Sequence, residues 1–181
     1  MNKYVILLRG INVGGKNTVS MKELKELLEK SGFHDVTTYI NSGNIIFSSG
    51  IADIMLLKST CEDLVLEKFN LKLSVMILSA DDLIEALDHA PDWWNDDIES
   101  KHNAIFVIPP ASILDIFQEV GEGKPEYERV GYFGQVIFWS APLKTFSMTR
   151  WSKVVGSSAY SSITIRNANT AIKLAELCKR S

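Results

Sequence analysis

The two halves of the chain repeat one order of predicted elements, and this duplication constrains the fold more than any other feature. Two matches carry it: Ser42-Gly-Asn-Ile-Ile-Phe-Ser-Ser49 with Phe133-Gly-Gln-Val-Ile-Phe-Trp-Ser140, and Ser79-Ala-Asp-Asp-Leu-Ile84 with Asn167-Ala-Asn-Thr-Ala-Ile172. The members of each pair lie about ninety residues apart, and such a constant spacing indicates an internal repeat.

Hydrophobic periodicity and turn residues give each half the order β-α-β-β-α-β. The predicted strands are residues 4–9, 35–40, 44–49 and 72–78, then 104–108, 127–132, 135–140 and 162–166. The predicted helices are residues 21–31, 51–69, 80–89, 111–120, 144–157 and 168–179. We therefore expect an α+β protein of two ferredoxin-like (βαββαβ) subdomains related by internal duplication, with antiparallel sheets backed by helices. Residues 1–89 and 103–181 form the subdomains, and residues 90–102 form an acidic, tryptophan-containing linker.

Composition limits the class of protein. With 181 residues, of which 46% are hydrophobic, the chain can bury a substantial core. Cys61 and Cys178 both fall on apolar helix stripes, which is typical of buried thiols and not of a disulfide. The opening apolar run is too short to span a membrane, and no signal-peptide pattern precedes it. We expect a cytoplasmic protein without a membrane partner.

Charge is distributed unevenly along the chain. Residues 80–128 carry a net charge of −11, and residues 129–181 carry +7. The cations of the last segment are spread out and not clustered, which is more typical of a solvated or internally paired surface than of a nucleic-acid interface. A nucleic-acid or protein partner for the basic second half remains the alternative hypothesis.

A glycine-rich loop follows the first predicted strand, with the sequence Arg9-Gly-Ile-Asn-Val-Gly-Gly-Lys16. Glycine allows backbone N–H groups to crowd around a ligand, and two flanking cations favour an anionic one. The second half has Pro109-Pro110-Ala-Ser at the same place, so the scaffold itself does not call for the glycines. This difference predicts that the loop is functional.

Known phosphate loops fit this segment poorly. It satisfies G-x-x-x-x-G-K, but Asn17 stands where a Ser or Thr should reach magnesium, and the next helix begins too late. A P-loop also needs a parallel sheet, which the hairpin-rich order argues against. Acylphosphatase carries a phosphate loop in the corresponding place, but its Gln-Gly pattern and closing Arg are absent here.

Other chemistries have weaker support. Phe133, Gly134, Val136 and Phe138 partly match an RNA-stacking strand, although a strand buried on both faces explains them as well. The three histidines lack metal-ligand spacing, and acidic linkers are commonly only solvated, so we predict no metal and no cofactor. Trp93 and Trp94 are expected to anchor the linker to a sheet or to form part of a partner surface.

Three motifs resemble one bacterial family: Leu7-Leu8-Arg9-Gly-Ile-Asn-Val-Gly-Gly-Lys16, Tyr39-Ile-Asn-Ser-Gly-Asn44 and Thr164-Ile-Arg-Asn-Ala-Asn-Thr-Ala-Ile-Lys-Leu174. They are similar to motifs of the domain-of-unknown-function family 1697. The resemblance implies a bacterial cytoplasmic protein with paired ferredoxin-like subdomains, and it implies no activity. Ala168 stands where the family usually has Trp, so a site that depends on that aromatic ring is altered here.

The motifs together define a candidate ligand site at the ends of strands. Its residues are Arg9, Asn12, Gly14, Gly15, Lys16, Asn41, Asn44, Arg166 and Asn167. We predict that they bind a small-molecule or phosphate-type anion, with or without catalysis, and we name no catalytic residue. The competing interpretation is that the polar residues form turns and helix caps while the glycines only permit tight turns.

Overall fold

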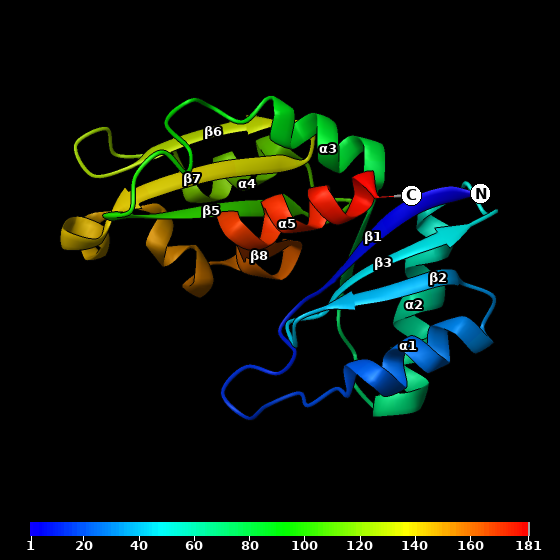
Figure 1. The fold of residues 1–181 in the computed structure, drawn as a ribbon. Helices are drawn as coiled ribbons and strands as arrows, with labels where there is room; N and C mark the ends of the chain where they lie inside the picture. The colour runs from blue at the N-terminus through cyan, green and yellow to red at the C-terminus, as the bar shows by residue number, and fades with distance from the viewer. Residues whose placement is uncertain (181) are drawn as a thin grey trace. The chain divides into compact units, whose positions relative to one another are not determined.

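The computed structural model describes residues 1–180. These residues contain two four-stranded antiparallel sheets (Figure 1). The chain divides into two units. The first comprises Met1–Leu83 together with the chain from Leu174 onward, and the second comprises Ile84–Lys173. None of the helices formed by these 180 residues is long and apolar enough to cross a membrane.

The first unit has the ferredoxin-like order. Its elements are β1 (Asn2–Leu8), α1 (Met21–Lys30), β2 (His34–Tyr39), β3 (Asn44–Ser49), α2 (Ile54–Phe69) and β4 (Val75–Ser79). Helix α3 (Ala80–Asp88) follows and passes into the second unit at Ile84. The strand order is β2-β3-β1-β4, and every neighbouring pair is antiparallel. β1 lies in the middle of the sheet, and its apolar residues 4–8 are all buried.

Helices α1 and α2 pack against one face of this sheet. Leu24 and Leu28 from α1 and Leu57 and Val65 from α2 join a core that includes Ile6. Helix α1 begins at Met21 because the hydroxyl of Ser20 accepts a hydrogen bond from the Glu23 N–H at 3.3 Å, which satisfies an otherwise unpaired donor of the first turn.

The second unit repeats this sheet. Its elements are β5 (Ser100–Val107), α4 (Ile113–Val120), β6 (Arg129–Phe133), β7 (Val136–Pro142), three 3-10 helices, β8 (Ile163–Asn167) and α5 (Ala168–Lys179). The strand order β6-β7-β5-β8 is antiparallel and equivalent to that of the first unit. The last turns of α5 belong with the first unit, where the Lys3 ammonium donates to the carbonyl oxygens of Cys178 and Arg180 at 3.0 and 2.7 Å.

The aligned strands occupy equivalent places in the two sheets, but the aligned phenylalanines face opposite sides of them. Phe47 belongs to the core under α1 and α2, whereas the corresponding core of the second unit contains Ile137 and Trp139, and the fully buried Phe138 packs against Trp94. Ser79 and Asn167 each accept a hydrogen bond from a backbone N–H three residues later, at 3.0 and 2.8 Å, and so cap the helices that follow. The duplicated α+β fold is confirmed.

One predicted helix is wrong. Residues 144–157 form two 3-10 helices, η1 (Leu143–Met148) and η2 (Trp151–Gly156), and η3 (Ser158–Ser162) follows. The backbone N–H groups of Arg150 and Trp151 donate to the side chain of Glu128 and not to carbonyl groups one α-helical turn back. The β-branched Val154 and Val155 and the helix-breaking Gly156 also disfavour an α-helix here.

Strand β5 begins at Ser100, so the last residues of the predicted linker lie in the sheet.

Gly43 gives a stability test of the β2–β3 connection. Its φ is +77°, and an added Cβ would lie 2.7 Å from Leu8 Cβ and 2.9 Å from Ile11 Cδ1. We expect Gly43→Ala to lower the free energy of unfolding by at least about 2 kcal/mol, because overpacking adds to backbone strain. In the control Gly50→Ala the new methyl group meets nothing within 4 Å, so its effect stays within about 0.5 kcal/mol. Urea unfolding measures both, and equal effects would contradict this packing.

Cys61 gives a test that depends on pH. Burial between α2 and the sheet raises the pKa of its thiol to about 12, and the charge of Glu62 adds to this. In a Cys178→Ala background we expect native Cys61 to react with a disulfide reagent far more slowly at pH 8 than the urea-unfolded chain does, because the thiolate is the nucleophile. The thiol of the unfolded chain loses its proton at a lower pH than the buried thiol does. The contribution of the buried thiol to the free energy of unfolding therefore falls as the pH rises from about 9. Rapid native labelling would show that this core is open.

Candidate functional site

The glycine-rich loop of the first unit is a small β-hairpin. Val13 and Lys16 form an antiparallel bridge, and the Lys16 N–H donates to the Val13 carbonyl at 3.0 Å. Gly14 and Gly15 between them have φ values of +58° and +75°. Positive φ at both central positions is what a type I′ hairpin turn requires, so these two glycines have a structural role in the tip of the loop.

Two asparagines fix the hairpin to the rest of the unit. Asn12 Nδ2 donates to the carbonyl oxygens of Val19 and Asn41 at 3.0 and 2.7 Å, and Asn12 Oδ1 accepts from the Val19 N–H at 2.8 Å. Asn17 Nδ2 donates to the Gly10 carbonyl at 2.9 Å. The loop is therefore ordered by its own side chains, and Asn12 joins it to the β2–β3 turn.

The other predicted site residues have different environments. Asn44 is fully buried and donates to the Tyr39 carbonyl and the Ser42 hydroxyl, so its amide closes the β2–β3 turn. Arg9 is half-buried at the base of the hairpin, whereas Lys16 is exposed near its tip. The structure thus brings the first two sequence motifs together in the first unit.

The third motif lies in the second unit, except for its last residue, Leu174. Arg166 lies in β8 with only 8% of its surface exposed, and its Nη1 donates to the Thr164 hydroxyl and the Ile165 carbonyl, both at 2.9 Å. Desolvation lowers the pKa of this guanidinium to about 10. Asn167 caps α5, as the competing interpretation of the sequence expected.

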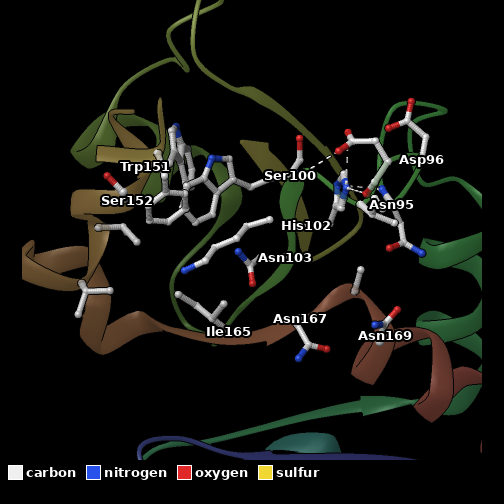
Figure 2. Close-up of a pocket in the computed structure, with 18 residues that line it drawn as sticks. Asn95, Asp96, Ser100, His102, Asn103, Trp151, Ser152, Ile165, Asn167 and Asn169 are labelled. Atoms are coloured by element: carbon white, nitrogen blue, oxygen red, sulfur yellow. Dashed lines mark hydrogen bonds and ion pairs between the residues drawn. The ribbon is translucent and has the colours of Figure 1, made fainter. Parts of the chain in front are cut away.

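The second unit contains a cavity that the sequence did not predict. It measures about 940 Å³ and lies where β5 runs past the end of β8 (Figure 2). Its lining comes from the linker (Asn95, Asp96, Asp97, Ile98), the sheet (Ser100, Lys101, His102, Asn103, Trp139, Ile165, Asn167), the 3-10 helices (Phe146, Trp151, Ser152, Val154, Val155) and the start of α5 (Ala168, Asn169). The first unit has the long helix α2 at the point in the chain where this unit has only 3-10 helices.

The buried carboxylate of Glu128 positions the aromatic part of the cavity. Its Oε1 accepts from the N–H groups of Lys124 and Arg150 at 2.9 and 2.7 Å, and its Oε2 accepts from Trp139 Nε1 and the Trp151 N–H, both at 3.1 Å. Glu128 is 4% exposed. Since Trp139 and Trp151 line the cavity, this one side chain ties the 3-10 helices to the sheet.

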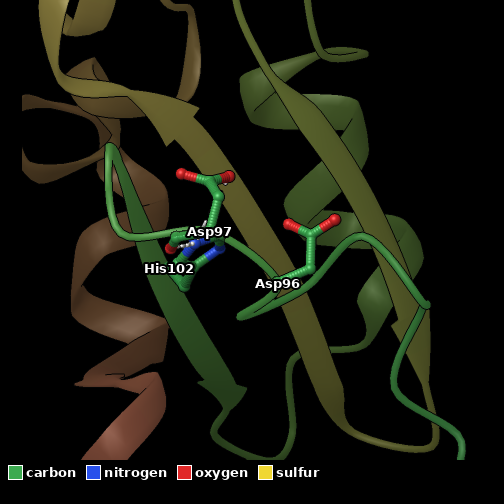
Figure 3. A group of neighbouring side chains, drawn as sticks. All are labelled: Asp96, Asp97 and His102. Atoms are coloured by element: carbon green, nitrogen blue, oxygen red, sulfur yellow. Dashed lines mark hydrogen bonds and ion pairs between the residues drawn. The ribbon is translucent and has the colours of Figure 1, made fainter.

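Among the described residues, the group that most resembles a metal site consists of Asp96, Asp97 and His102 (Figure 3). Their possible ligand atoms lie within 4.8 Å of one another. Both ring nitrogens of His102 already form hydrogen bonds. Its Nδ1 accepts from the Asn95 N–H and the Ser140 hydroxyl at 3.0 and 2.6 Å, and its Nε2 lies 2.8 Å from the Asp97 carbonyl oxygen. Because a carbonyl only accepts, Nε2 carries the proton and no ring nitrogen is left to ligate a metal. We assign His102 to holding the linker against the sheet.

Asp97 and Trp94 also hold the linker. Asp97 Oδ1 accepts from the N–H groups of Glu99 and Ser100 at 2.8 and 2.7 Å. Partial desolvation raises the pKa of Asp97, but the hydrogen bonds from Ser100 and Glu99 outweigh it, so the pKa lies below its ordinary value. Trp94 Nε1 donates to the Asn103 carbonyl at 2.9 Å, and its ring packs edge-on against Phe138. The predicted anchoring role of the tryptophan pair is confirmed for Trp94.

Ala168 connects the cavity with the sequence analysis. It is buried and lines the cavity at the start of α5, and it is the position where the family resemblance implies a tryptophan. Neither the cavity nor the role of Glu128 had a recognisable signal in the sequence. Both depend on residues 143–162 forming 3-10 helices at the place where the first unit has the α-helix α2.

Glu128→Gln tests the buried carboxylate. A glutamine side chain keeps the shape but loses the charge and replaces one acceptor oxygen by an NH₂ group, which faces N–H donors. We expect the free energy of unfolding to fall by roughly 2–4 kcal/mol, since several buried donors lose their partner. Glu126→Gln is the matched control, because Glu126 is exposed. Thermal unfolding together with tryptophan fluorescence measures the effect, and a neutral Glu128→Gln would refute the positioning role.

Comparison with known proteins places the chain in a family. A search of curated proteins gives no match. Among solved structures, the chain is similar to the conserved bacterial protein SP0830 from Streptococcus pneumoniae, at 32% sequence identity and a TM-score of 0.88. The similarity covers 98% of this chain and 99% of that one. The family model described as Protein of unknown function (DUF1697) matches residues 1–138, which include the first two of the three motifs. The chain therefore belongs to this DUF1697 family.

Proposed function

We propose that this protein binds a small anion, of phosphate or carboxylate type, at the loop Arg9–Lys16. One comparison within the molecule carries the proposal. The second unit passes from β5 to α4 through residues 108–112, whereas the first unit uses residues 9–20 for the equivalent passage from β1 to α1. The hairpin is therefore an addition that the fold itself does not need.

The geometry of the loop supports an anionic ligand. Arg9 stands at its base and Lys16 near its tip, while the side chains of Asn12 and Asn17 hold the backbone in place. A loop ordered before binding loses little conformational entropy when a ligand arrives. Cations on such a framework attract an anion, and exposed glycine backbone allows it to approach closely.

Backbone strain next to the loop also supports a function there. Ile40 has a φ of +49° and is 52% exposed in the turn that Asn12 contacts. A β-branched residue rarely adopts a left-handed conformation, and such strain is concentrated at functional sites. We further propose that the protein acts in the bacterial cytoplasm, in line with its bacterial structural relative and its two buried free cysteines.

An NMR titration of ¹⁵N-labelled protein with inorganic phosphate and acetyl phosphate tests the proposal. We expect the amide signals of Gly14, Gly15 and Lys16 to shift in a saturable way. Arg9→Ala and Lys16→Ala should each weaken the affinity roughly tenfold or more, because each removes a charge-assisted contact. Lys72→Ala, an exposed lysine of the same unit, is the control.

Two results would contradict anion binding at the loop. One is the absence of loop shifts with these anions and with a panel of nucleotides. The other is salt-dependent binding of RNA or DNA that survives both loop substitutions, which would favour the alternative function of an interaction module using the basic second half.

A further inference from the structure

We propose that the cavity of the second unit is a separate binding site for a small zwitterion with an apolar body, of the class of apolar amino acids and short peptides. This site is independent of the loop Arg9–Lys16. Its volume of about 940 Å³ is at the upper end of the range for small-molecule sites. Three properties of its lining point to this class of ligand.

The first property is that opposite charges lie on different walls. The Lys101 ammonium lies 4.4 Å from the centre of the Phe146 ring, which places it against the 3-10 helices. Asp96 and Asp97 belong to the linker wall, and Figure 2 shows Asp96 on the side of the cavity opposite Trp151 and Ser152. A ligand with a carboxylate at one end and an ammonium at the other complements both walls, whereas a dianion would meet two carboxylates.

The second property is that the rest of the lining consists largely of apolar, aromatic and amide side chains. Ile165 from the sheet and Phe146 and Val155 from the 3-10 helices offer accessible apolar surface, and the nearly fully buried Trp139 and Trp151 belong to the same lining. Asn103 and Asn169 also belong to the lining and add amide side chains to it, whereas the Oδ1 of the neighbouring Asn167 caps α5. Such a surface accommodates an apolar side chain, and the amides match the donors and acceptors of a peptide group.

The third property is that both walls are held in place by buried polar groups. Glu128 Oε2 accepts from the Trp139 indole N–H and the Trp151 backbone N–H, and its Oε1 accepts from the N–H groups of Lys124 and Arg150. On the other side, the ring of His102 binds the linker through Asn95 and Asp97. A buried network that positions both walls is expected of a preorganised site and not of an accidental gap.

Titration calorimetry with alanyl-phenylalanine tests the proposal when its N-acetylated and C-amidated forms are measured beside it. We expect the zwitterion to bind and each capped form to bind at least about fivefold more weakly, because one end charge is lost. Lys101→Ala should weaken the binding of the dipeptide but should not further weaken the binding of the C-amidated form, which has no carboxylate. Asp96→Asn should weaken the binding of the dipeptide but should not further weaken the binding of the N-acetylated form, which has no ammonium group. Lys144→Ala and Asp92→Asn are the matched controls, since both residues are exposed and lie outside the cavity lining.

The indole N–H signals of Trp139 and Trp151 provide a second readout and should shift on binding. The proposal is overturned if capped and uncapped forms bind equally, or if the control substitutions act like those at Lys101 and Asp96. It is also overturned if neither the dipeptide nor free phenylalanine and leucine shift these signals at about 10 mM. Arg9→Ala and Lys16→Ala should leave this binding unchanged, so failure at one site is distinguishable from failure at the other.

Discussion

The carboxylate of Glu128 accepts four hydrogen bonds inside the second unit, and the arrangement of the 3-10 helices depends on them. In the first unit the corresponding face of the sheet is covered by α2, an α-helix that satisfies its own backbone groups. Residues 143–162 form only short 3-10 turns, and at the start of η2 the N–H groups of Arg150 and Trp151 bond to Glu128 instead of to backbone carbonyl groups. A buried anion that accepts from those groups removes the cost of burying them, and this makes an irregular wall compatible with a packed interior.

The duplication separates what the fold requires from what has been added to it. Both units have the same strand order and the same capping position before their last helix. They differ most at two places, namely the hairpin after β1 and the 3-10 segment after β7. Each candidate site lies at one of these places. Features present in both copies are accounted for by the shared fold, and the two differences are therefore the places that the proposals concern.

The sequence predicted the sheets well because their signals are local. Alternating or continuous apolar runs such as 44–49 and a turn at Gly134 are sufficient to define strands and their pairing. The failures have non-local causes. The segment after Pro142 has enough apolar residues to suggest a helix, but its backbone donors pair with Glu128, a residue earlier in the chain. The cavity was missed for the same reason, since its walls come from four distant segments.

The candidate loop shows why residue type alone could not separate binding from structure. Asparagine was expected either to contact a ligand or to form turns, and Asn12, Asn44 and Asn167 all hydrogen-bond to backbone groups of this chain. Their amides are therefore engaged in shaping the loops. The ligand-binding hypothesis then depends on Arg9 and Lys16 and on the exposed backbone between them, which the asparagines hold in position. An asparagine substitution would disturb both shape and binding, whereas Lys16, exposed on an ordered hairpin, separates the two.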